Sequence, residues 1–366
     1  MILQINKMYA PEIGGVESVV KEYSEFLQEY DDVSVLAIKA NFSLRTSVEY
    51  INGVKVYRCA SLGTYMSMPL SLVFFIYLFF LAKKANVIHF HEPFPLGCVG
   101  SFLVSKEKKI FVTWHSDIIK QKSIKHFFEF FQKRLCAKAH TIIATSKNLI
   151  DFSPILRRFR QKVEVIPLAI DPEKYETIEM KNVSLEHLPS EYVLFLGRFS
   201  YYKGIFVLLE AIEKVDKKVP FVIAGNGELL DEIKKRITRI DREVVLIDRF
   251  VTEDEKKYLL KNSKFMVFPS IYPSEAFGII QLESMIYSKP VINTTLPTGV
   301  PWVSLDMESG LSVEVGNSIA LANAIERLYF DEKLYQKLSR GACDRFKNLF
   351  TNKRVNAQLH SLYFGK

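Results

Sequence analysis

One pattern recurs over most of the chain: a short apolar run typical of a buried strand is followed by a stretch with helical periodicity. Strands that alternate with helices predict a parallel sheet covered by helices on both faces. The alternation is interrupted once and then resumes, so it predicts two such sheets. The apolar runs lie at 2–6, 33–38, 54–57, 86–91, 110–114, 141–145 and 163–166 before the interruption, and at 192–197, 221–224, 244–247, 265–268 and 290–293 after it.

The interruption marks a domain boundary. Pro167 and Pro172 enclose a short segment, and the residues from 173 to 190 are polar with little periodicity. A length of 366 residues is enough for two sizeable hydrophobic cores. We therefore expect an α/β protein of two Rossmann-like, doubly wound domains that face each other across a cleft. The first spans 1–168 and the second 169–348, and a C-terminal helix within 349–366 is expected to pack back onto the first.

Composition excludes several other classes of protein. Hydrophobic residues make up 48% of the chain and charged residues 25%, as in globular proteins. The sequence contains no repeat unit of a solenoid and no low-complexity segment. The four cysteines are scattered and form no Cys-x-x-Cys pair, so we expect reduced thiols in a cytoplasmic protein. Because the first residues already form an apolar run, no signal peptide is expected.

The excess of positive charge lies in the first half of the chain. Residues 1–170 hold 22 Lys+Arg and 14 Asp+Glu, whereas residues 171–366 hold 27 of each. The segment 106–138 concentrates nine basic residues against three acidic ones. Such a one-sided field suits an anionic lipid surface, a nucleic acid or a diphosphate substrate, or it is a solvated face without a partner.

The densest apolar run of the chain is 72–82, within the uncharged stretch that follows Arg58. It is too short to span a bilayer, which needs about 20 apolar residues. Pro69 is expected to begin a helix that is either buried in the core or interfacial, with Lys83 and Lys84 at its edge. An interfacial helix would share an anionic membrane surface with the basic segment, which predicts a peripheral position at the inner face of the cell membrane.

Polar groups follow several of the predicted strands in the first half. In open α/β sheets, ligands bind beyond the carboxyl ends of the strands, so residues at these positions are candidates for chemistry. A glycine pair after a strand also lets backbone amides approach a phosphate or a hydroxyl. The groups are Gly14-Gly15, His91 and His115-Ser116-Asp117.

Cations and glycines mark strand ends in the second half. Arg198 follows Gly197, and Lys203 lies five residues further on. The planar fork of an arginine and the point charge of a lysine together suit the β-phosphate of a departing nucleoside diphosphate. The next strand ends in a turn formed by Gly225-Asn226-Gly227.

The segment 269–291 is the most informative part of the sequence. Ser274 is predicted to be the N-cap of a helix that ends near Tyr287, with unpaired backbone N–H groups in its first turn and Gly278 allowing close approach. In such a helix Glu275 and Glu283 lie about 12 Å apart and face one cleft. One carboxylate would then meet a sugar and the other a ribose.

The string Pro-Ser-x-x-x-x-Glu-x-Phe-Gly-x-x-x-x-Glu-x-Met at 269–285 resembles the signature of retaining nucleotide-sugar glycosyltransferases of family 4, which have the GT-B fold. The groups named above extend the resemblance over nearly the whole chain. It implies catalytic roles for Glu275, His115, Arg198 and Lys203. It implies donor binding by Gly14, Gly15, Arg198, Lys203, Gly225, Asn226, Phe250, Val251, Glu275, Phe277, Gly278, Ile279 and Glu283, and acceptor binding by Tyr9, His91, Ser116 and Asp117.

The resemblance also implies a mechanism. Arg198 and Lys203 would hold the diphosphate, Glu275 the sugar hydroxyls and Glu283 the ribose. Transfer would proceed with retention by front-face displacement. No Asp-x-Asp motif occurs in the chain, and neither a metal nor another cofactor is expected.

Three positions depart from the family pattern: Ala169, Ser284 and the loop 297–302. That loop, with the Trp-His-Ser-Asp string at 114–117, most resembles bacterial polysaccharide and O-antigen transferases. This favours GDP-mannose as donor and a lipid-linked or polysaccharide acceptor.

Other functions remain open at this point. A UDP-sugar-dependent transferase or a 2-epimerase would share the fold and the donor site. A non-catalytic, membrane-associated partner subunit would share the fold alone. No nucleic-acid partner is expected, because no basic segment with interleaved aromatic residues forms a binding module.

Overall fold

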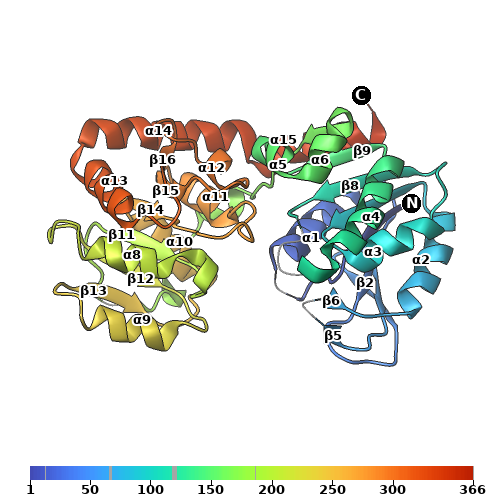
Figure 1. The fold of residues 1–366 in the computed structure, drawn as a ribbon, viewed down its shortest axis with the longest axis horizontal. Helices are drawn as coiled ribbons and strands as arrows, with labels where there is room; N and C mark the ends of the chain where they lie inside the picture. The colour runs from blue at the N-terminus through green and yellow to red at the C-terminus, as the bar shows by residue number, and fades with distance from the viewer. Residues whose placement is uncertain (13, 66–67, 118–121, 186, 366) are drawn as a thin grey trace. The chain divides into compact units, whose positions relative to one another are not determined.

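The computed structural model describes residues 1–12, 14–65, 68–117, 122–185 and 187–365. The chain divides into two compact units (Figure 1). The first unit consists of Met1–Leu168 together with Asn356–Lys366, and the second of Ala169–Val355.

The first unit is built on an eight-stranded sheet. Its strands are β1 Ile2–Ile5, β2 Val33–Ile38, β3 Ser47–Ile51, β4 Val54–Cys59, β7 Val87–Glu92, β8 Lys109–Trp114, β9 Thr141–Ala144 and β10 Val163–Val165. They lie in the order β10-β9-β8-β7-β1-β2-β4-β3, and every neighbouring pair is parallel except β3 and β4. The fold class predicted from the sequence is confirmed, with one antiparallel strand at the sheet edge.

Helices cover both faces of this sheet (Figure 1). They are α1 Gly15–Leu27, α2 Val73–Lys84, α3 Pro95–Gly100, α4 Lys122–Lys138, α5 Lys147–Phe152 and α6 Pro154–Arg158. The prediction that Pro69 begins a helix is wrong. Pro69 lies in the short strand β6 Met68–Pro69, which pairs with β5 Thr64–Tyr65, and α2 begins at Val73.

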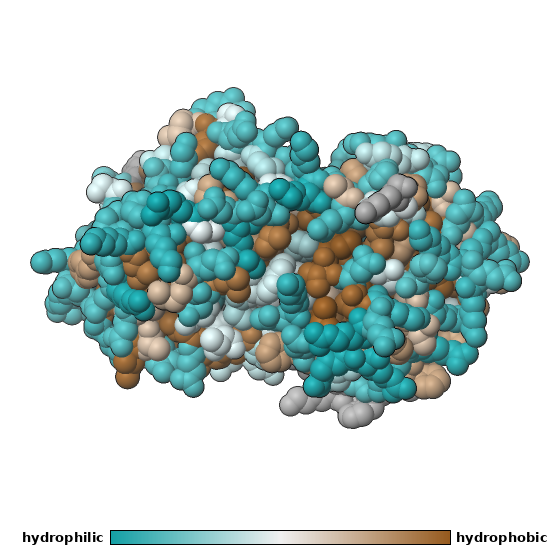
Figure 2. Space-filling view, turned by 90° about the horizontal axis from the view of Figure 1, so that it is seen from above, coloured by the Kyte–Doolittle hydropathy of each residue, from teal (hydrophilic) through white to brown (hydrophobic). Residues whose placement is uncertain are grey.

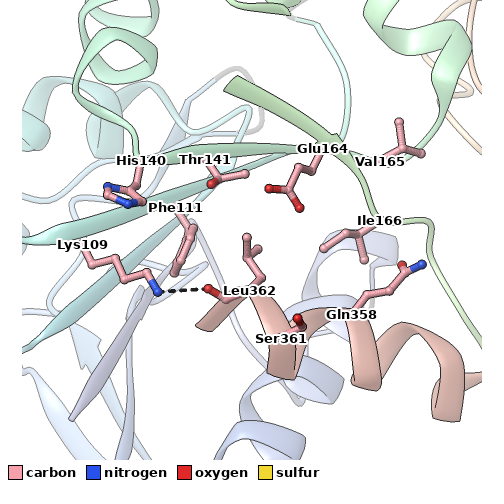
Figure 3. A pocket seen from close by; sticks show the side chains of 10 residues that line it. All are labelled: Lys109, Phe111, His140, Thr141, Glu164, Val165, Ile166, Gln358, Ser361 and Leu362. Carbon is pink, nitrogen blue, oxygen red and sulfur yellow. Dashed lines mark hydrogen bonds between the residues drawn. The ribbon is translucent and has the colours of Figure 1, made fainter. Parts of the chain in front are cut away.

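The C-terminal helix α15, Asn352–Phe364, ends in the first unit. Its last turn is held by Lys109, whose Nζ donates to the backbone oxygen of Leu362 at 3.0 Å (Figure 3) and to that of Tyr363 at 2.9 Å. The Tyr363 ring is buried against Phe111, with the ring centroids 4.7 Å apart. A residue four positions from the end of the chain therefore belongs to the core of the first unit.

The second unit has a six-stranded, wholly parallel sheet in the order β13-β12-β11-β14-β15-β16. The strands are β11 Val193–Leu196, β12 Phe221–Ala224, β13 Val244–Ile247, β14 Phe265–Val267, β15 Val291–Thr294 and β16 Gly310–Val313. The helices are α7 Glu173–Glu176, α8 Ile205–Ile212, α9 Leu230–Ile237, α10 Glu253–Asn262, α11 Ile279–Met285, α12 Val300–Val303, α13 Ser318–Phe330 and α14 Glu332–Leu349.

The strands of the second unit are almost entirely apolar, and all but the partly buried edge strand β13 lie mostly within the core. The outer surface differs: on the face shown in Figure 2, hydrophilic side chains predominate and apolar ones gather in a few areas. Among the described residues, none of the helices combines the length and the apolar character that a membrane span requires.

Candidate functional site

An ion pair between Lys203 and Glu275 lies at the centre of the candidate site in the second unit. The Nζ of Lys203 lies 2.5 Å from Oε2 of Glu275, and the two side chains are only 15% and 12% exposed. Lys203 ends the 3-10 turn Tyr201–Lys203, and Gly204 follows it in the left-handed conformation, with φ 69°. The ammonium also lies 4.9 Å from the ring centroid of Phe268. A partly buried charge pair is thus held between two strand-end loops.

Glu275 does not lie in a helix, and this corrects the sequence prediction. Helix α11 begins at Ile279. Its N-cap residue is Gly278, which has φ 77°, and no side-chain hydrogen bond caps the helix. A Cβ on Gly278 would come within 2.7 Å of the Phe268 ring, so the backbone turns there in a way that only glycine permits. Ser274 is therefore no N-cap, and its buried hydroxyl has no hydrogen-bond partner. Because Glu275 lies outside α11, the helical spacing that was predicted to relate Glu275 to Glu283 does not apply.

Glu283 is held by two residues that the sequence did not single out. Its Oε1 accepts hydrogen bonds from the Tyr175 hydroxyl (2.6 Å) and from the ammonium of Lys256 (2.8 Å). Burial, and next the charge of Glu283, raise the pKa of Tyr175 well above its usual range, so the phenol keeps its proton and donates. Both bonds use Oε1, which orients the carboxylate with Oε2 directed elsewhere.

Arg198 differs from Lys203 in its surroundings. Its side chain is 68% exposed, and Nε lies 3.6 Å from Oε2 of Glu228. The two turns beside it are tightly packed, because a Cβ on Gly225 would lie 1.9 Å from the backbone oxygen of Gly197. The glycine at 225 is thus required by the close approach of two strand ends.

The remaining predicted donor residues lie on neighbouring turns and on α11. Asn226 donates from Nδ2 to the backbone oxygen of Asp248 at 3.5 Å, which links the turns after β12 and β13. Phe250, in the second of these turns, is 73% exposed. Phe277 is buried and packs beside Trp302, with ring centroids 6.5 Å apart.

The unusual loop at 297–302 contacts the 269–291 segment directly. The backbone N–H of Gly299 donates to the oxygen of Ala276 at 2.8 Å, and Gln281 Nε2 donates to the oxygen of Val300 at 3.3 Å. The departure from the family pattern therefore lies against the loop that carries Glu275.

In the first unit the predicted histidines are joined. Nδ1 of His91 lies 3.1 Å from Nε2 of His115, and the rings stack with centroids 5.4 Å apart. Burial lowers the pKa of His115 to about 3, with the nearby charge of Lys7 adding to the effect. Both imidazoles are therefore neutral at physiological pH.

The other residues predicted to bind the acceptor differ in their surroundings. Tyr9 is fully buried, so its hydroxyl has no access to an acceptor in this conformation. Asp117 accepts hydrogen bonds on Oδ1 from Trp114 Nε1 (2.8 Å) and from the Ser153 hydroxyl (2.7 Å). Ser116 follows His115 and is partly exposed.

The glycine turn lies beside a charge pair that sequence reasoning missed. Gly14 is the N-cap of α1, which begins at Gly15. A Cβ on Gly14 would lie 2.1 Å from Oε2 of Glu17, so the carboxylate covers the glycine. Lys7 Nζ lies 3.9 Å from Oε1 of Glu17. The signal was an acidic residue in the first turn of a helix, a position too common to stand out.

Two cavities of the first unit lie apart from these residues. One of about 600 Å³ lies between α15 and the strands β8 to β10 (Figure 3). Its lining residues are Lys109, Phe111, His140, Thr141, Glu164, Val165, Ile166, Gln358, Ser361 and Leu362. A smaller one of about 390 Å³ is lined by Lys106, Arg134, Ala137 and Lys138 of the basic segment. Within the described part of the chain, no three His, Cys, Asp or Glu side chains gather as metal ligands would.

The chain consists of two α/β units, each with a largely parallel sheet and with charged and glycine-rich turns at its strand ends. This is the architecture of GT-B glycosyltransferases. The chain belongs to the glycosyltransferases of family 4 and group 1. Residues 13–174 match the Glycosyltransferase Family 4 model, and residues 176–345 match the model for Glycosyl transferases group 1. The predicted fold class and family relationship are confirmed.

Individual relatives agree with this assignment. The D-rhamnosyltransferase WbpZ of Pseudomonas aeruginosa is 32% identical over 355 residues, which are 96% of this chain and 92% of the relative. The O-antigen chain mannosyltransferase C of Escherichia coli is 27% identical over 352 residues, which are 96% and 94% of the two chains.

Solved structures with little sequence identity share the fold. Sucrose-phosphate synthase from Thermosynechococcus elongatus has a TM-score of 0.75 at 19% identity, covering 99% of this chain and 98% of its own. WaaG, a glycosyltransferase involved in lipopolysaccharide biosynthesis, has a TM-score of 0.71 at 12% identity over the full length of both chains.

Proposed function

We propose that this chain transfers a hexose, with retention, from a nucleoside diphosphate sugar to a lipid-linked or polysaccharide acceptor in the synthesis of a cell-surface polysaccharide. The observation that carries the proposal is the partly buried pair of Lys203 and Glu275. An ammonium has three N–H donors, so Lys203 can bind a phosphate oxygen while it still holds Glu275 in place. The carboxylate would then accept hydrogen bonds from the sugar hydroxyls.

The chemistry follows from where negative charge develops. As the bond between the sugar and the β-phosphate breaks, the phosphate gains charge beside Lys203 and the exposed Arg198. The acceptor hydroxyl attacks from the same face, and its proton passes to the departing phosphate oxygen. Electrons of the broken bond leave with the diphosphate, so no metal or other cofactor is needed to balance the reaction.

A manno-configured donor, with GDP-mannose favoured, is our proposal for the substrate. The two relatives described above are a mannosyltransferase and a D-rhamnosyltransferase, and D-rhamnose is the 6-deoxy form of D-mannose. The two sugars therefore share the axial 2-hydroxyl and differ only at C6. Glu283, oriented through its Oε1 by Tyr175 and Lys256, would accept hydrogen bonds from the ribose hydroxyls on Oε2.

A thermal-shift panel of GDP, UDP, ADP and dTDP tests the donor site, because a bound nucleotide stabilises the folded state according to its affinity. We expect GDP to give the largest shift. Incubation of GDP-mannose with an O-antigen primer should then yield an α-linked product by NMR, also in the presence of EDTA. No stabilisation by any diphosphate would overturn the proposal, and conversion of the donor without an acceptor would indicate an epimerase instead.

We further propose that the first unit binds the anionic inner face of the cell membrane through one side of α2. That helix buries Phe74, Leu78, Leu81 and Ala82 in the core and turns the opposite side outward, and this outward side supports the proposal. We call the exposed apolar residues on this side the α2 surface. It includes two residues of the 3-10 turn Ser101–Leu103, which packs beside α2. Its members are Leu72, Ile76, Phe79, Phe80, Phe102 and Leu103.

Cations border the α2 surface. Lys83 lies over the Phe79 ring at 4.0 Å, and Arg134 over the Phe102 ring at 4.6 Å. Lys106, Lys108 and Lys138 come from the same basic segment, whereas the side chains of Lys120, Lys122 and Lys125 lie outside the described residues. Apolar side chains ringed by cations suit the headgroup region of an anionic bilayer.

Vesicle sedimentation tests this second proposal. The protein should bind vesicles containing phosphatidylglycerol and not those of phosphatidylcholine alone. The double variant Ile76→Ser/Phe80→Ser should lose binding, whereas Phe330→Ser, which alters a comparably exposed side chain of the second unit, should not. Equal binding to both lipids would refute the electrostatic part.

A further inference from the structure

A continuous chain of side-chain hydrogen bonds runs through the core of the first unit. It starts at His115, passes through His91 and Gln4 to Tyr363, and ends beyond His89 at Thr113. The recorded distances are 3.1 Å for His115 to His91, 2.8 Å for His91 to Gln4, 3.2 Å for Gln4 to Tyr363 and 2.7 Å for His89 to Thr113, and the Tyr363 hydroxyl also contacts Nδ1 of His89. All six residues are buried.

The sheet register brings these residues together. Gln4 of β1 pairs with His89 of β7, and His91 of the same strand pairs with Thr113 of β8. Tyr363 comes from α15, at the other end of the sequence. Lys109 holds the last turn of that helix through two backbone oxygens, of which Figure 3 shows that of Leu362. The chain of hydrogen bonds therefore depends on a residue that no local pattern connects with His115.

The atoms involved define the direction of these hydrogen bonds. The Gln4 amide is placed so that its Nε2 donates to the Tyr363 hydroxyl and its Oε1 faces His91; in this placement Oε1 can only accept, so Nε2 of His91 carries the proton. Nδ1 of the neutral His91 is then an acceptor, and Nε2 of His115 must donate to it. A neutral His115 that is protonated on Nε2 has its lone pair on Nδ1.

The other branch is consistent with this direction. Gln4 donates from Nε2 to the Tyr363 hydroxyl, which gives its single proton to Nδ1 of His89. His89 then donates from Nε2 to the Thr113 hydroxyl. If the Tyr363 hydroxyl were removed, both the Gln4 amide and Nδ1 of His89 would lose a partner, and the Gln4 side chain would no longer be held in one orientation.

We propose that Gln4 and Tyr363 are positioning residues that hold His115 in the tautomer protonated on Nε2, which leaves its Nδ1 as an acceptor for a hydroxyl of a bound substrate. The second half of this statement rests on the proposed function. The first half concerns the folded protein alone. A neutral histidine with a lone pair on Nδ1 can orient a substrate hydroxyl without adding positive charge to the site.

Nitrogen-15 NMR of histidine-labelled protein tests the tautomer directly. In the native chain, the resonances of His115 and His91 should both show a proton on Nε2. In Tyr363→Phe, the His115 nitrogens should shift toward a mixture of tautomers. A native His115 protonated on Nδ1, or nitrogen shifts unchanged in Tyr363→Phe, would overturn the proposal whatever the substrate proves to be.

Tyr23→Phe is the matched control. The Tyr23 ring packs against both His89 and His91, at centroid distances of 6.3 and 6.2 Å, but its buried hydroxyl has no partner. The Tyr23→Phe substitution should leave the histidine nitrogen shifts and the turnover unchanged. Tyr363→Phe should lower kcat on the order of tenfold while KM for the donor stays the same. A protein that binds no nucleoside diphosphate would contradict the proposed function, and the NMR result would still decide the tautomer.

Discussion

The ammonium of Lys203 and the carboxylate of Glu275 lie 2.5 Å apart, on two loops that follow different strands of the second unit. Each charge depends on the other for its partner in a site that is largely shielded from water. Lys203 and Glu275 therefore form one charge pair that would bind a donor sugar together with its phosphate. The consequences of breaking this pair can be measured.

The Glu275→Gln variant removes the negative charge and retains the shape of the side chain. We expect turnover to fall by about 100-fold or more, because the sugar loses a charged acceptor. Stability should fall by only about 1–3 kcal/mol, so the fold should persist by circular dichroism. Glu228→Gln, beside the exposed Arg198, should change turnover little. Near-normal turnover of the Glu275→Gln variant would remove Glu275 from the site.

Glu283 should contribute to nucleotide affinity through the ribose. Glu283→Gln is expected to weaken GDP binding by about 10-fold to 100-fold, as for the loss of a hydrogen bond to a charged group. The control is Glu253→Gln, because Lys256 lies 2.8 Å from both glutamates and only Glu283 is buried. Calorimetry with 2′,3′-dideoxy-GDP is decisive. That ligand should bind the native chain and the Glu283→Gln variant equally, and a large difference would place Glu283 elsewhere.

Alanine substitutions at two glycines can distinguish the stability cost of backbone strain from that of a steric clash. Gly278 and Gly316 both have φ 77°, but a Cβ at 278 would meet the Phe268 ring at 2.7 Å, whereas at 316 it would enter open space. Gly316→Ala should cost about 1 kcal/mol of unfolding free energy. Gly278→Ala should cost about 1–3 kcal/mol more and weaken nucleotide binding. Equal losses in urea unfolding would show that the loop before α11 yields easily.

The buried histidines should make the first unit sensitive to acid. Burial lowers the pKa of His89 and of His115 from 6.5 to about 3, and that of His91 well below 6.5. Below pH 6.5 the unfolded chain binds protons that the folded chain does not, so stability is complete above pH 6.5 and is lost as the pH falls toward 3. Each histidine contributes a slope of up to about 1.4 kcal/mol per pH unit.

Fluorescence of Trp114, which is buried in the first unit, can report this loss in a Trp302→Phe background. The free energy of unfolding should decrease between pH 7.5 and pH 5. His91→Gln should flatten the decrease, and His140→Gln, at an exposed position, should not. A pH-independent free energy over this range would contradict the neutral state of the buried histidines.

Much of the architecture is local information, and the sequence predicted it. Apolar runs such as 33–38 and 221–224 are strands with those bounds, because burial on both faces leaves a continuous apolar signature, and the partly buried edge strand 244–247 has the predicted bounds as well. Strand β3 was missed because most of it is exposed, although Asn52 and Gly53, with φ 48° and 83°, form the hairpin turn that marks it. Strand β16 was missed as well; it is short and begins with a glycine.

The sequence also predicted which residue types would stand at the strand ends, but not their partners. Periodicity wrongly extended α11 back to Ser274, since the helix begins only after the left-handed turn at Gly278, where the Phe268 ring leaves no room for a side chain. The pairing of Lys203 with Glu275, of Tyr175 with Glu283 and of Tyr363 with His89 joins residues distant along the chain. Short-range patterns record how the backbone coils and which face is buried. Which charges and hydrogen-bond donors meet is decided by packing, because only burial in one core brings such residues within bonding distance and makes leaving them unpaired costly.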